Sequence, residues 1–383
     1  MSRPTVVDLL CPELYARDGG VQNYGRTLLK GLLQVLPAET RLRVFVRNDF
    51  SSHMPVAVDP RLELHPCGSR LPLLSLLQLV LVALMATMRR RPALVIATHP
   101  HLAPLQLLLG RLAGCPTWAA AHGIDVWTLR FGLRRWALQR LELVLPVSRY
   151  TRDQLHHQLG RRCPELVVLP NSFNQNRFRP GPRPVALLER YSLRPEQPLI
   201  FSITRLSSKD CYKHIDALIT AMPELRKLWP DLVLLIGGDG DDRPRLRRRV
   251  QQLRLSEAVL LPGRIADAEL ADHYRLSSLF ALPSEGEGFG IVFLEALGCG
   301  KPVLAGNRDG SVDPLADGAF GCLVDPRLPL APPLRALLEG YGEELWFRPE
   351  ALSAAVAERF GSGAFLAGLQ SLLARLPVLG VEA

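Results

Sequence analysis

Short runs of Val, Leu and Ile alternate with longer stretches of helical periodicity along most of the chain. Continuous apolar runs are typical of strands covered on both faces, and strands separated by helices form parallel sheets. The pattern therefore predicts an α/β fold with more strands than one Rossmann-like sheet holds. The expected strands are Thr5–Cys11, Arg41–Arg47, Arg61–Cys67, Ala93–His99, Thr117–His122, Leu143–Val147, Leu166–Leu169, Leu199–Thr204, Leu232–Gly237, Val259–Leu261, Leu279–Pro283 and Pro302–Ala305.

Two Rossmann-like domains are expected, joined through residues 177–198. This segment contains five prolines and follows an expected strand, which favours a linker. The predicted domains are residues 1–180 and 181–350. Ligands of such folds bind at the carboxyl ends of the strands, so we expect the site in a cleft that the two sheets face.

Charge divides unevenly between these halves. The 383 residues carry a net charge of +9, but residues 1–180 hold 23 Lys and Arg against 11 Asp and Glu. The first half is therefore strongly basic and is expected to meet an anionic partner: a phospholipid surface, a lipid phosphate or nucleic acid. The seven cysteines include no C-x-x-C pair, which favours a reducing, cytoplasmic setting.

Residues 71–88 contain no charged side chain and are followed by three consecutive arginines, residues 89–91. Eighteen apolar residues are the lower limit for a helix that spans a bilayer. Proline, serine and glutamine interrupt the stretch, and strand-like runs flank it on both sides. We therefore favour a core helix whose basic end touches the bilayer over a transmembrane helix.

The strongest local signal is PSEGEGFGIVFLEALGCGKP, residues 283–302. A glycine-rich loop follows a strand and leads into a helix over Ile291–Leu297 that is apolar except at Glu295. A buried carboxylate requires hydrogen-bond donors, and the vicinal hydroxyls of a ribose would supply them. The free N–H groups at the helix start suit phosphate. The alternative is a helix-capping acid with a structural ion pair.

Glu287 and Glu295, with Gly-Phe-Gly after the first, resemble the E-x7-E motif of family 4 glycosyltransferases, which have the GT-B fold of two Rossmann-like domains. The resemblance implies a retaining enzyme that uses a nucleotide-sugar donor. It assigns Glu287 to orienting the sugar and Glu295 to the ribose. Phe289, Gly290 and Ile291, between the two glutamates, are also expected to bind the donor.

The family also carries an Arg and a Lys at the start of the second domain, where they hold the donor diphosphate. Here Arg205 follows the strand LIFSIT, and two lysines compete for the second role. Lys213 directly precedes the helix HIDALITAM, as the family lysine does, so we favour Lys213 over Lys209. Fixed cations would stabilise the charge that the leaving diphosphate gains.

In the first domain, DGGVQN, residues 18–23, resembles the family's glycine-rich loop, which closes over the donor phosphates and borders the acceptor. Gly19 and Gly20 would allow close backbone approach, and Asn23 would face the acceptor. His122 follows the strand TWAAA and is expected to line the reacting centre. Asp125 is a candidate for binding an acceptor hydroxyl.

Arg264 follows the strand VLLP and is expected to reach phosphate.

Three other signals are discounted. The acidic loop at residues 237–242 lacks the third glycine of a dinucleotide fingerprint, and His99-Pro100-His101 has no further ligand at zinc spacing. The arginine-rich helix at 243–254 has no interleaved aromatics, so nucleic acid is not expected as a partner. No metal or other cofactor is expected.

The resemblance implies transfer of a hexose from a nucleotide-sugar to an acceptor hydroxyl with retention. It also implies that the last helices, residues 351–383, cross back to the first domain. GNRDGSVD, residues 306–313, looks most like mannosyl-type exopolysaccharide enzymes. We expect a saccharide or a polyprenyl-diphosphate-linked saccharide as acceptor and an anionic membrane surface as partner. The expected location is cytoplasmic and peripheral, on the inner face of the plasma membrane. Bacterial exopolysaccharide or lipopolysaccharide assembly is the natural setting.

Two other functions remain open at this point. A nucleotide-sugar epimerase shares the fold, and it would not require an acceptor or a basic membrane-facing domain. A non-catalytic sugar-binding assembly subunit would be favoured by loss of the donor residues, yet the sequence retains all of them.

Overall fold

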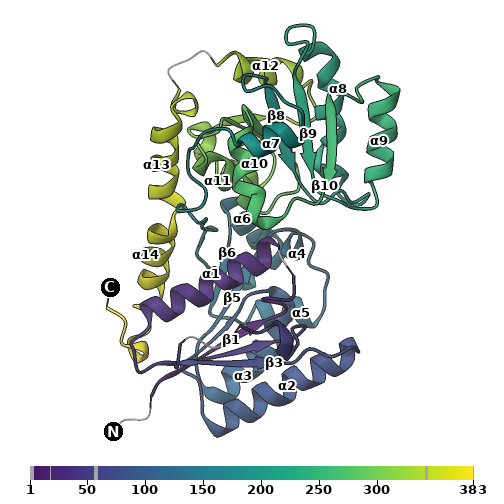
Figure 1. The fold of residues 1–383 in the computed structure, drawn as a ribbon. Coiled ribbons are helices and arrows are strands. Elements are labelled where there is room, and N and C mark those ends of the chain that lie inside the picture. The colour runs from purple at the N-terminus through teal and green to yellow at the C-terminus, as the bar shows by residue number, and fades with distance from the viewer. Residues whose placement is uncertain (1–3, 18, 56–58, 341–343, 383) are drawn as a thin grey trace. The chain divides into compact units, whose positions relative to one another are not determined.

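The computed structural model describes residues 4–17, 19–55, 59–340 and 344–382. Its contacts divide the chain into two compact units (Figure 1). Unit 1 comprises Met1–Ser172 with Gly363–Ala383, and unit 2 comprises Phe173–Ser362. Asp18, the first residue of the glycine-rich motif, lies outside the described residues. Each unit is described by itself.

Unit 1 is built on a seven-stranded parallel sheet with the strand order β3-β2-β1-β4-β5-β6-β7. Every described strand pair in it is parallel, as the continuous apolar runs predict. The strands are β1 Val6–Cys11, β2 Arg41–Val46, β3 Leu62–Pro66, β4 Leu94–Ala97, β5 Thr117–Ala121, β6 Leu143–Pro146 and β7 Glu165–Leu166. The helices are α1 Gly20–Val35, α2 Pro72–Arg89, α3 Ala103–Ala113, α4 Ile124–Trp127, α5 Leu133–Leu138, α6 Arg149–Leu159 and α14 Ser362–Leu373.

Unit 2 holds a six-stranded parallel sheet with the order β10-β9-β8-β11-β12-β13. The strands are β8 Leu199–Ile203, β9 Val233–Gly237, β10 Val259–Gly263, β11 Leu279–Leu282, β12 Val303–Gly306 and β13 Cys322–Val324. The helices are α7 Val185–Arg190, α8 Ile215–Leu225, α9 Arg243–Gln252, α10 Leu270–Leu276, α11 Ile291–Gly298, α12 Ala331–Glu339 and α13 Pro349–Phe360. The prediction of two Rossmann-like sheets is confirmed, and β13 is the strand that the hydrophobic pattern did not predict.

Both faces of the unit 1 sheet are covered. The helices α2 and α3 lie on one side of the sheet and α1 lies on the other (Figure 1). All six residues of β1 are buried, as a strand between two helical layers requires. Within β1, Asp8 is buried and binds the guanidinium of Arg43 from β2, with Nε–Oδ1 and Nη2–Oδ2 distances of 2.7 and 2.8 Å. Burial raises the pKa of Asp8 to about 6 despite this partner.

The proline-rich segment 177–198 is not a free linker, because it packs onto unit 2. Arg275 of α10 donates to the carbonyls of Arg177 and Arg179, and α7 packs against α10. Arg183 donates to the hydroxyl of Ser278 at 2.9 Å. The unit boundary at Ser172 therefore precedes the prolines, because these hydrogen bonds tie the segment to unit 2.

The chain returns to unit 1 between its last two long helices. Helix α13 packs on α11 inside unit 2. Helix α14 belongs to unit 1, where the side chain of Leu369 lies against Gly31 of α1. A Cβ atom on Gly31 would come within 2.9 Å of Leu369, so the small residue permits this close approach.

Candidate functional site

The loop after β11 carries Glu287, and the loop after β12 holds it in place. Asp309 is buried and accepts hydrogen bonds from the N–H groups of Glu287 (2.5 Å) and Ser311 (2.9 Å). The carbonyl of Glu287 in turn accepts the N–H of Gly310 at 2.9 Å. Burial raises the pKa of Asp309 to about 6, although these N–H groups oppose the rise. Both backbone polar groups of Glu287 are thus fixed by one neighbouring loop.

Lys213 and Glu287 form an ion pair between Nζ and Oε1, and both side chains are largely buried. Lys213 belongs to the short turn before α8, and its ammonium group lies 5.4 Å from the ring centre of Tyr212. An ammonium group has three N–H donors, so pairing with one carboxylate leaves donors for a second anion. The structure brings Lys213 and Glu287 together as one charged pair.

Helix α11 begins directly after this loop. Gly290 precedes it with φ of +86°, and a Cβ atom there would come within 2.4 Å of the Phe293 ring. The first N–H groups of a helix have no partner inside it, and α11 has no side-chain cap at Gly290. Phe293 N–H already donates to the Gly290 carbonyl at 3.1 Å, so the N–H groups of Ile291 and Val292 are the ones that suit an anion. The side chain of Phe289 does not face this anion site, because its ring is buried against Phe360 of α13.

Glu295 lies on α11 and is 6% exposed. Its Oε2 accepts a hydrogen bond from the Tyr274 hydroxyl of α10 at 2.9 Å. Burial raises the pKa of Glu295 to about 7, and the Tyr274 hydrogen bond opposes the rise. The expected donor to this carboxylate is therefore supplied by the protein, at least for one oxygen. Tyr274 could not be recognised from the sequence, because no spacing rule links it to Glu295.

Arg205 and Lys209 lie on the loop after β8 and are more exposed than Lys213. Arg205 is 72% exposed and its Nη2 binds Asp210 at 2.7 Å, which raises the pKa of the guanidinium. Arg264 is also exposed, after β10. The structure favours Lys213 over Lys209 as the lysine nearest the glutamate motif.

The glycine loop after β9 packs closely against the Arg205 loop. A Cβ atom on Gly238 would lie 1.8 Å from the Thr204 carbonyl, and one on Gly240 would lie 2.0 Å from that of Leu206. Asp241 accepts from the N–H and hydroxyl of Ser208. Among the described residues, no group of three His, Cys, Asp or Glu side chains is placed to hold a metal ion. Whether the reaction uses a metal stays a prediction.

In unit 1, His122 lies at the carboxyl end of β5. Its Nε2 is 2.7 Å from the Thr98 carbonyl, which assigns the ring proton to Nε2. Its backbone N–H donates to Oδ2 of Asp125 at 3.2 Å. The other carboxylate oxygen, Oδ1 of Asp125, is buried and has no hydrogen-bond partner among the described residues. Asp125 therefore has one hydrogen-bond acceptor that the described residues leave unused.

His99, which the sequence offers only as part of a weak zinc-like pair with His101, lies beside His122. Its ring stacks at 6.0 Å from that of His122, and its Nε2 lies 3.8 Å from Asp125 Oδ2. Burial lowers the pKa of His99 to about 4, so the ring is neutral at pH 7. The signal in the sequence that points to His99 is its position two residues after β4, the strand that pairs with β5.

The glycine-rich loop of unit 1 opens α1. The carbonyl of Gly19 accepts the N–H of Asn23 at 2.9 Å, and Gly20 has open space where a side chain would stand. The side-chain oxygen of Asn23 accepts from Arg26. In the described part of this loop there is thus open space beside Gly20, whereas the side-chain oxygen of Asn23 already accepts a hydrogen bond from Arg26.

Comparison with known proteins places both units in families of sugar-transferring enzymes. Residues 187–339 match the family described as glycosyl transferases group 1, and residues 18–177 match glycosyltransferase family 4. The GDP-mannose-dependent alpha-(1-6)-phosphatidylinositol monomannoside mannosyltransferase of Mycolicibacterium smegmatis is 37% identical over 238 residues. The GDP-mannose-dependent monoacylated alpha-(1-6)-phosphatidylinositol monomannoside mannosyltransferase of Corynebacterium glutamicum is 30% identical over 240 residues. Each match covers 58% of this chain and 61% of that protein.

Solved structures share the fold over nearly the whole chain. Sucrose-phosphate synthase from Thermosynechococcus elongatus superposes with a TM-score of 0.80 at 20% identity, covering 98% of this chain and 99% of that one. HepE of Anabaena in complex with UDP-glucose gives a TM-score of 0.75 at 20% identity, with 96% and 99% covered. At this identity the likeness establishes the fold.

Proposed function

We propose that this chain, which belongs to glycosyltransferase family 4, transfers a mannosyl group from GDP-mannose to a lipid-linked saccharide with retention of configuration. The donor site is assigned to unit 2 and the acceptor site to unit 1. The curated relatives match over 61% of their length, so the activity, the donor and the acceptor are all part of the proposal.

The Lys213–Glu287 pair before the N-terminus of α11 is the observation that carries the donor site. A diphosphate seated there would meet the helix N–H groups and the remaining donors of Lys213. Glu287 would face the sugar, with its backbone fixed by Asp309. Glu295, further along α11, would accept from the ribose hydroxyls while Tyr274 occupies its other side.

The reaction breaks the bond between the anomeric carbon of mannose and the diphosphate oxygen. A new bond forms between that carbon and the acceptor hydroxyl oxygen, and the hydroxyl proton passes to the departing diphosphate. Negative charge grows on the diphosphate in the transition state. Fixed donors aimed at that charge, Lys213 and the start of α11, lower the barrier. In this scheme His122 would border the sugar. Its Nε2 donates to the Thr98 carbonyl, so Nδ1 is the ring nitrogen that it would present.

Mannose and guanosine are favoured by the relatives, whose names describe GDP-mannose-dependent enzymes. The same names describe acceptors built on a phosphatidylinositol lipid, which supports a lipid-linked acceptor. We keep bacterial polysaccharide or lipopolysaccharide assembly as the proposed setting, at the cytoplasmic surface of the plasma membrane. The basic first half of the sequence supports an anionic membrane as partner.

The first test is a thermal-shift comparison of the purified chain with GDP, UDP, ADP and their sugars. A ligand that binds only the folded state raises the melting temperature, so GDP and GDP-mannose should raise it most. Glu295→Gln should abolish the shift. Glu339→Gln is the matched control, because Glu339 also lies on a unit 2 helix but pairs at the surface with Arg335.

Transfer is then measured directly with labelled GDP-mannose and a lipid extract containing saccharide acceptors. Label in a glycolipid product supports the proposal. A folded protein that shifts with no nucleotide, or that consumes the donor only by converting it into another nucleotide-sugar, would overturn it.

A further inference from the structure

The helix α2 exposes an unusual amount of apolar surface. Its buried side chains fall on one stripe, Ser75, Leu79, Ala83 and Thr87, spaced four residues apart. The other faces are also apolar, yet they lie in solvent: Leu73 is 67% exposed and Met88 is 73% exposed, with Leu74, Leu76, Leu77 and Leu81 also exposed. A large contiguous apolar surface marks an interaction site.

The apolar surface continues onto the neighbouring helices. Helix α3 packs against both α2 and α5, and these helices share one buried core. Leu108 and Leu112 of α3 are exposed, and so are Leu133 and Trp136 of α5. Phe131, directly before α5, is 90% exposed. We call this surface, formed by α2, α3 and residues 128–140, the α2–α3–α5 face.

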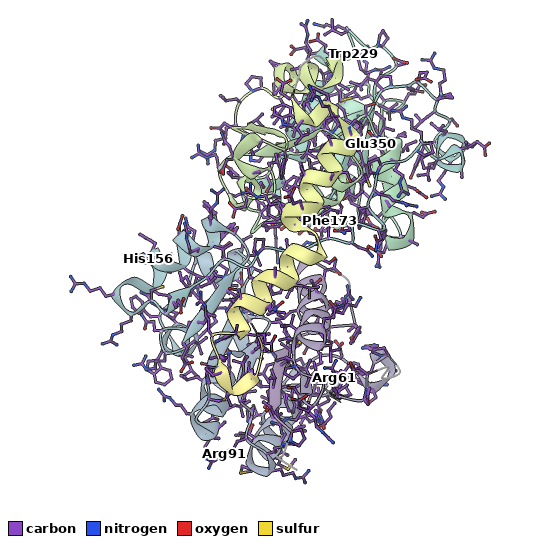
Figure 2. The ribbon with its side chains drawn as sticks, turned by 90° about the vertical axis from the view of Figure 1, so that its left-hand side faces the viewer. Arg61, Arg91, His156, Phe173, Trp229 and Glu350 are labelled. Atoms are coloured by element: carbon purple, nitrogen blue, oxygen red, sulfur yellow. The ribbon has the colours of Figure 1, made fainter. Side chains whose placement is uncertain are left out.

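The same face is strongly basic. Residues 70–91 contain four arginines, residues 103–115 contain one, and residues 128–140 contain four; none of these segments contains Asp or Glu. Arg91, labelled in Figure 2, follows α2 at the surface of unit 1. Arginine side chains can lie along an apolar surface while keeping the charged end in a polar layer. This mixture of leucine and arginine therefore suits the boundary between the acyl chains and the anionic headgroups of a bilayer.

A cavity of about 400 Å³ lies at the edge of this face, with Arg111 and Arg140 in its lining. Both guanidinium groups stack on Trp136, at 5.5 and 4.3 Å from the ring centre. The acidic residue of the lining, Glu142, is engaged by the N–H and hydroxyl of Thr117. The cavity therefore offers two cations beside an exposed indole, the arrangement expected where a phosphate meets an apolar layer.

We propose that the α2–α3–α5 face is the surface by which this protein lies on an anionic phospholipid bilayer. The exposed leucines of α2 enter the acyl boundary, Trp136 lies at headgroup depth, and Arg111 and Arg140 take a lipid phosphate. The membrane as partner belongs to the proposed function; the surface and the phosphate site are the new assignment. Neither depends on the donor site.

Helix α2 is long and apolar enough to cross a bilayer, and only 22% of its residues are buried in the structure. Contacts to the sheet hold it in unit 1 instead. Arg43, which pairs with the buried Asp8, also donates to the carbonyl of Ala86 at 2.7 Å. Ser75 Oγ accepts the N–H of Ser69 at 2.8 Å. If α2 spanned a bilayer, Arg43 would lose its contact with Ala86 and Leu79 would leave the unit 1 core. We therefore assign α2 to the surface of the bilayer.

The test is co-sedimentation of the full chain with vesicles of phosphatidylcholine, with and without phosphatidylglycerol. We expect binding to the anionic vesicles only, weakened about tenfold or more by Arg111→Gln with Arg140→Gln. Leu73→Gln with Leu77→Gln and Leu81→Gln should weaken it at least as much. The controls in unit 2 are Arg247→Gln with Arg248→Gln, and Leu228→Gln with Leu328→Gln, all at exposed positions.

Three outcomes would overturn the assignment. The first is equal loss of binding in the unit 2 controls. The second is wild-type protein that resists extraction from membranes by high salt and alkaline washing, which indicates a span. The third is a dimer that the leucine changes dissociate while vesicles bind no protein. An unchanged melting temperature shows that each variant folds. The GDP shift is recorded separately, so failure of the donor site is distinguishable from failure of the membrane face.

Discussion

The ammonium group of Lys213 and the carboxylate of Glu287 pair across the loops that follow β8 and β11, 74 residues apart in the chain. The two strands are neighbours in the unit 2 sheet, so their carboxyl ends lie side by side. The pair therefore joins the two sequence motifs that indicate a donor site, at the start of α11.

Replacement of Lys213 tests which lysine holds the diphosphate. Lys213→Gln removes a charged donor and should weaken GDP binding by about 1.5–3 kcal/mol. Lys209→Gln and Lys227→Gln alter exposed lysines and should change it little. Isothermal titration calorimetry with GDP measures all three. A larger loss in Lys209→Gln would assign the role to the other lysine.

Asp309 is expected to act on catalysis through Glu287. Asn at this position accepts one N–H but presents an amide donor to the other, so the Glu287 loop loses part of its support. We expect Asp309→Asn to lower kcat with GDP-mannose by about tenfold or more while the Kd for GDP changes little, because Glu287 faces the sugar. Asp325→Asn, after β13, is the matched control. Equal loss of GDP affinity and kcat would indicate general disorder of the site.

Gly310 should tolerate no side chain. A Cβ atom there would come within 2.1 Å of the Gly288 carbonyl, a backbone atom that cannot turn aside. Gly310→Ala should push the Glu287 loop away and lower both the melting temperature and activity. Gly363→Ala is a suitable control, because nothing lies near its added Cβ. Full activity in Gly310→Ala would show that the contact between these loops does not position Glu287.

The fold followed from hydrophobic runs wherever the strand is long and buried on both faces. The run Cys322–Val324 is apolar but only three residues long, so the hydrophobic pattern does not distinguish this edge strand, β13, from a loop. The helix expected over Ile291–Leu297 is observed as Ile291–Gly298. Its boundary was visible because Gly290 and the change to apolar residues mark its start.

The site was less predictable than the fold. The glutamate spacing and the family resemblance singled out Glu287, Glu295 and Lys213 as candidates, but neither could show that Tyr274 donates to Glu295. Nor could they show that the Phe289 ring points into the core. These contacts depend on how α10, α11 and α13 pack, and the side-chain direction at a loop residue has no periodic signature.

Glu295 should make stability depend on pH. Its folded pKa of about 7 lies above its ordinary value of 4.5, so the folded state binds the proton more tightly than the unfolded state. The stability that this proton contributes is complete below about pH 4.5 and is lost as pH rises through about 7, a change of up to about 3 kcal/mol. Glu295→Gln removes the titration.

The melting temperature of Glu295→Gln, relative to that of the wild type, should therefore increase as pH rises from about 5 to about 8. Glu339→Gln should show no such trend relative to the wild type. A constant difference between Glu295→Gln and the wild type across this range would contradict the raised pKa.

The most direct test of the central claim is a crystal structure of the full chain with GDP bound. The account predicts the diphosphate at the N-terminus of α11, within hydrogen-bond distance of Lys213 Nζ, and the ribose hydroxyls on Glu295. A nucleotide bound elsewhere in unit 2, or one that leaves Lys213 and Glu295 untouched, would contradict it.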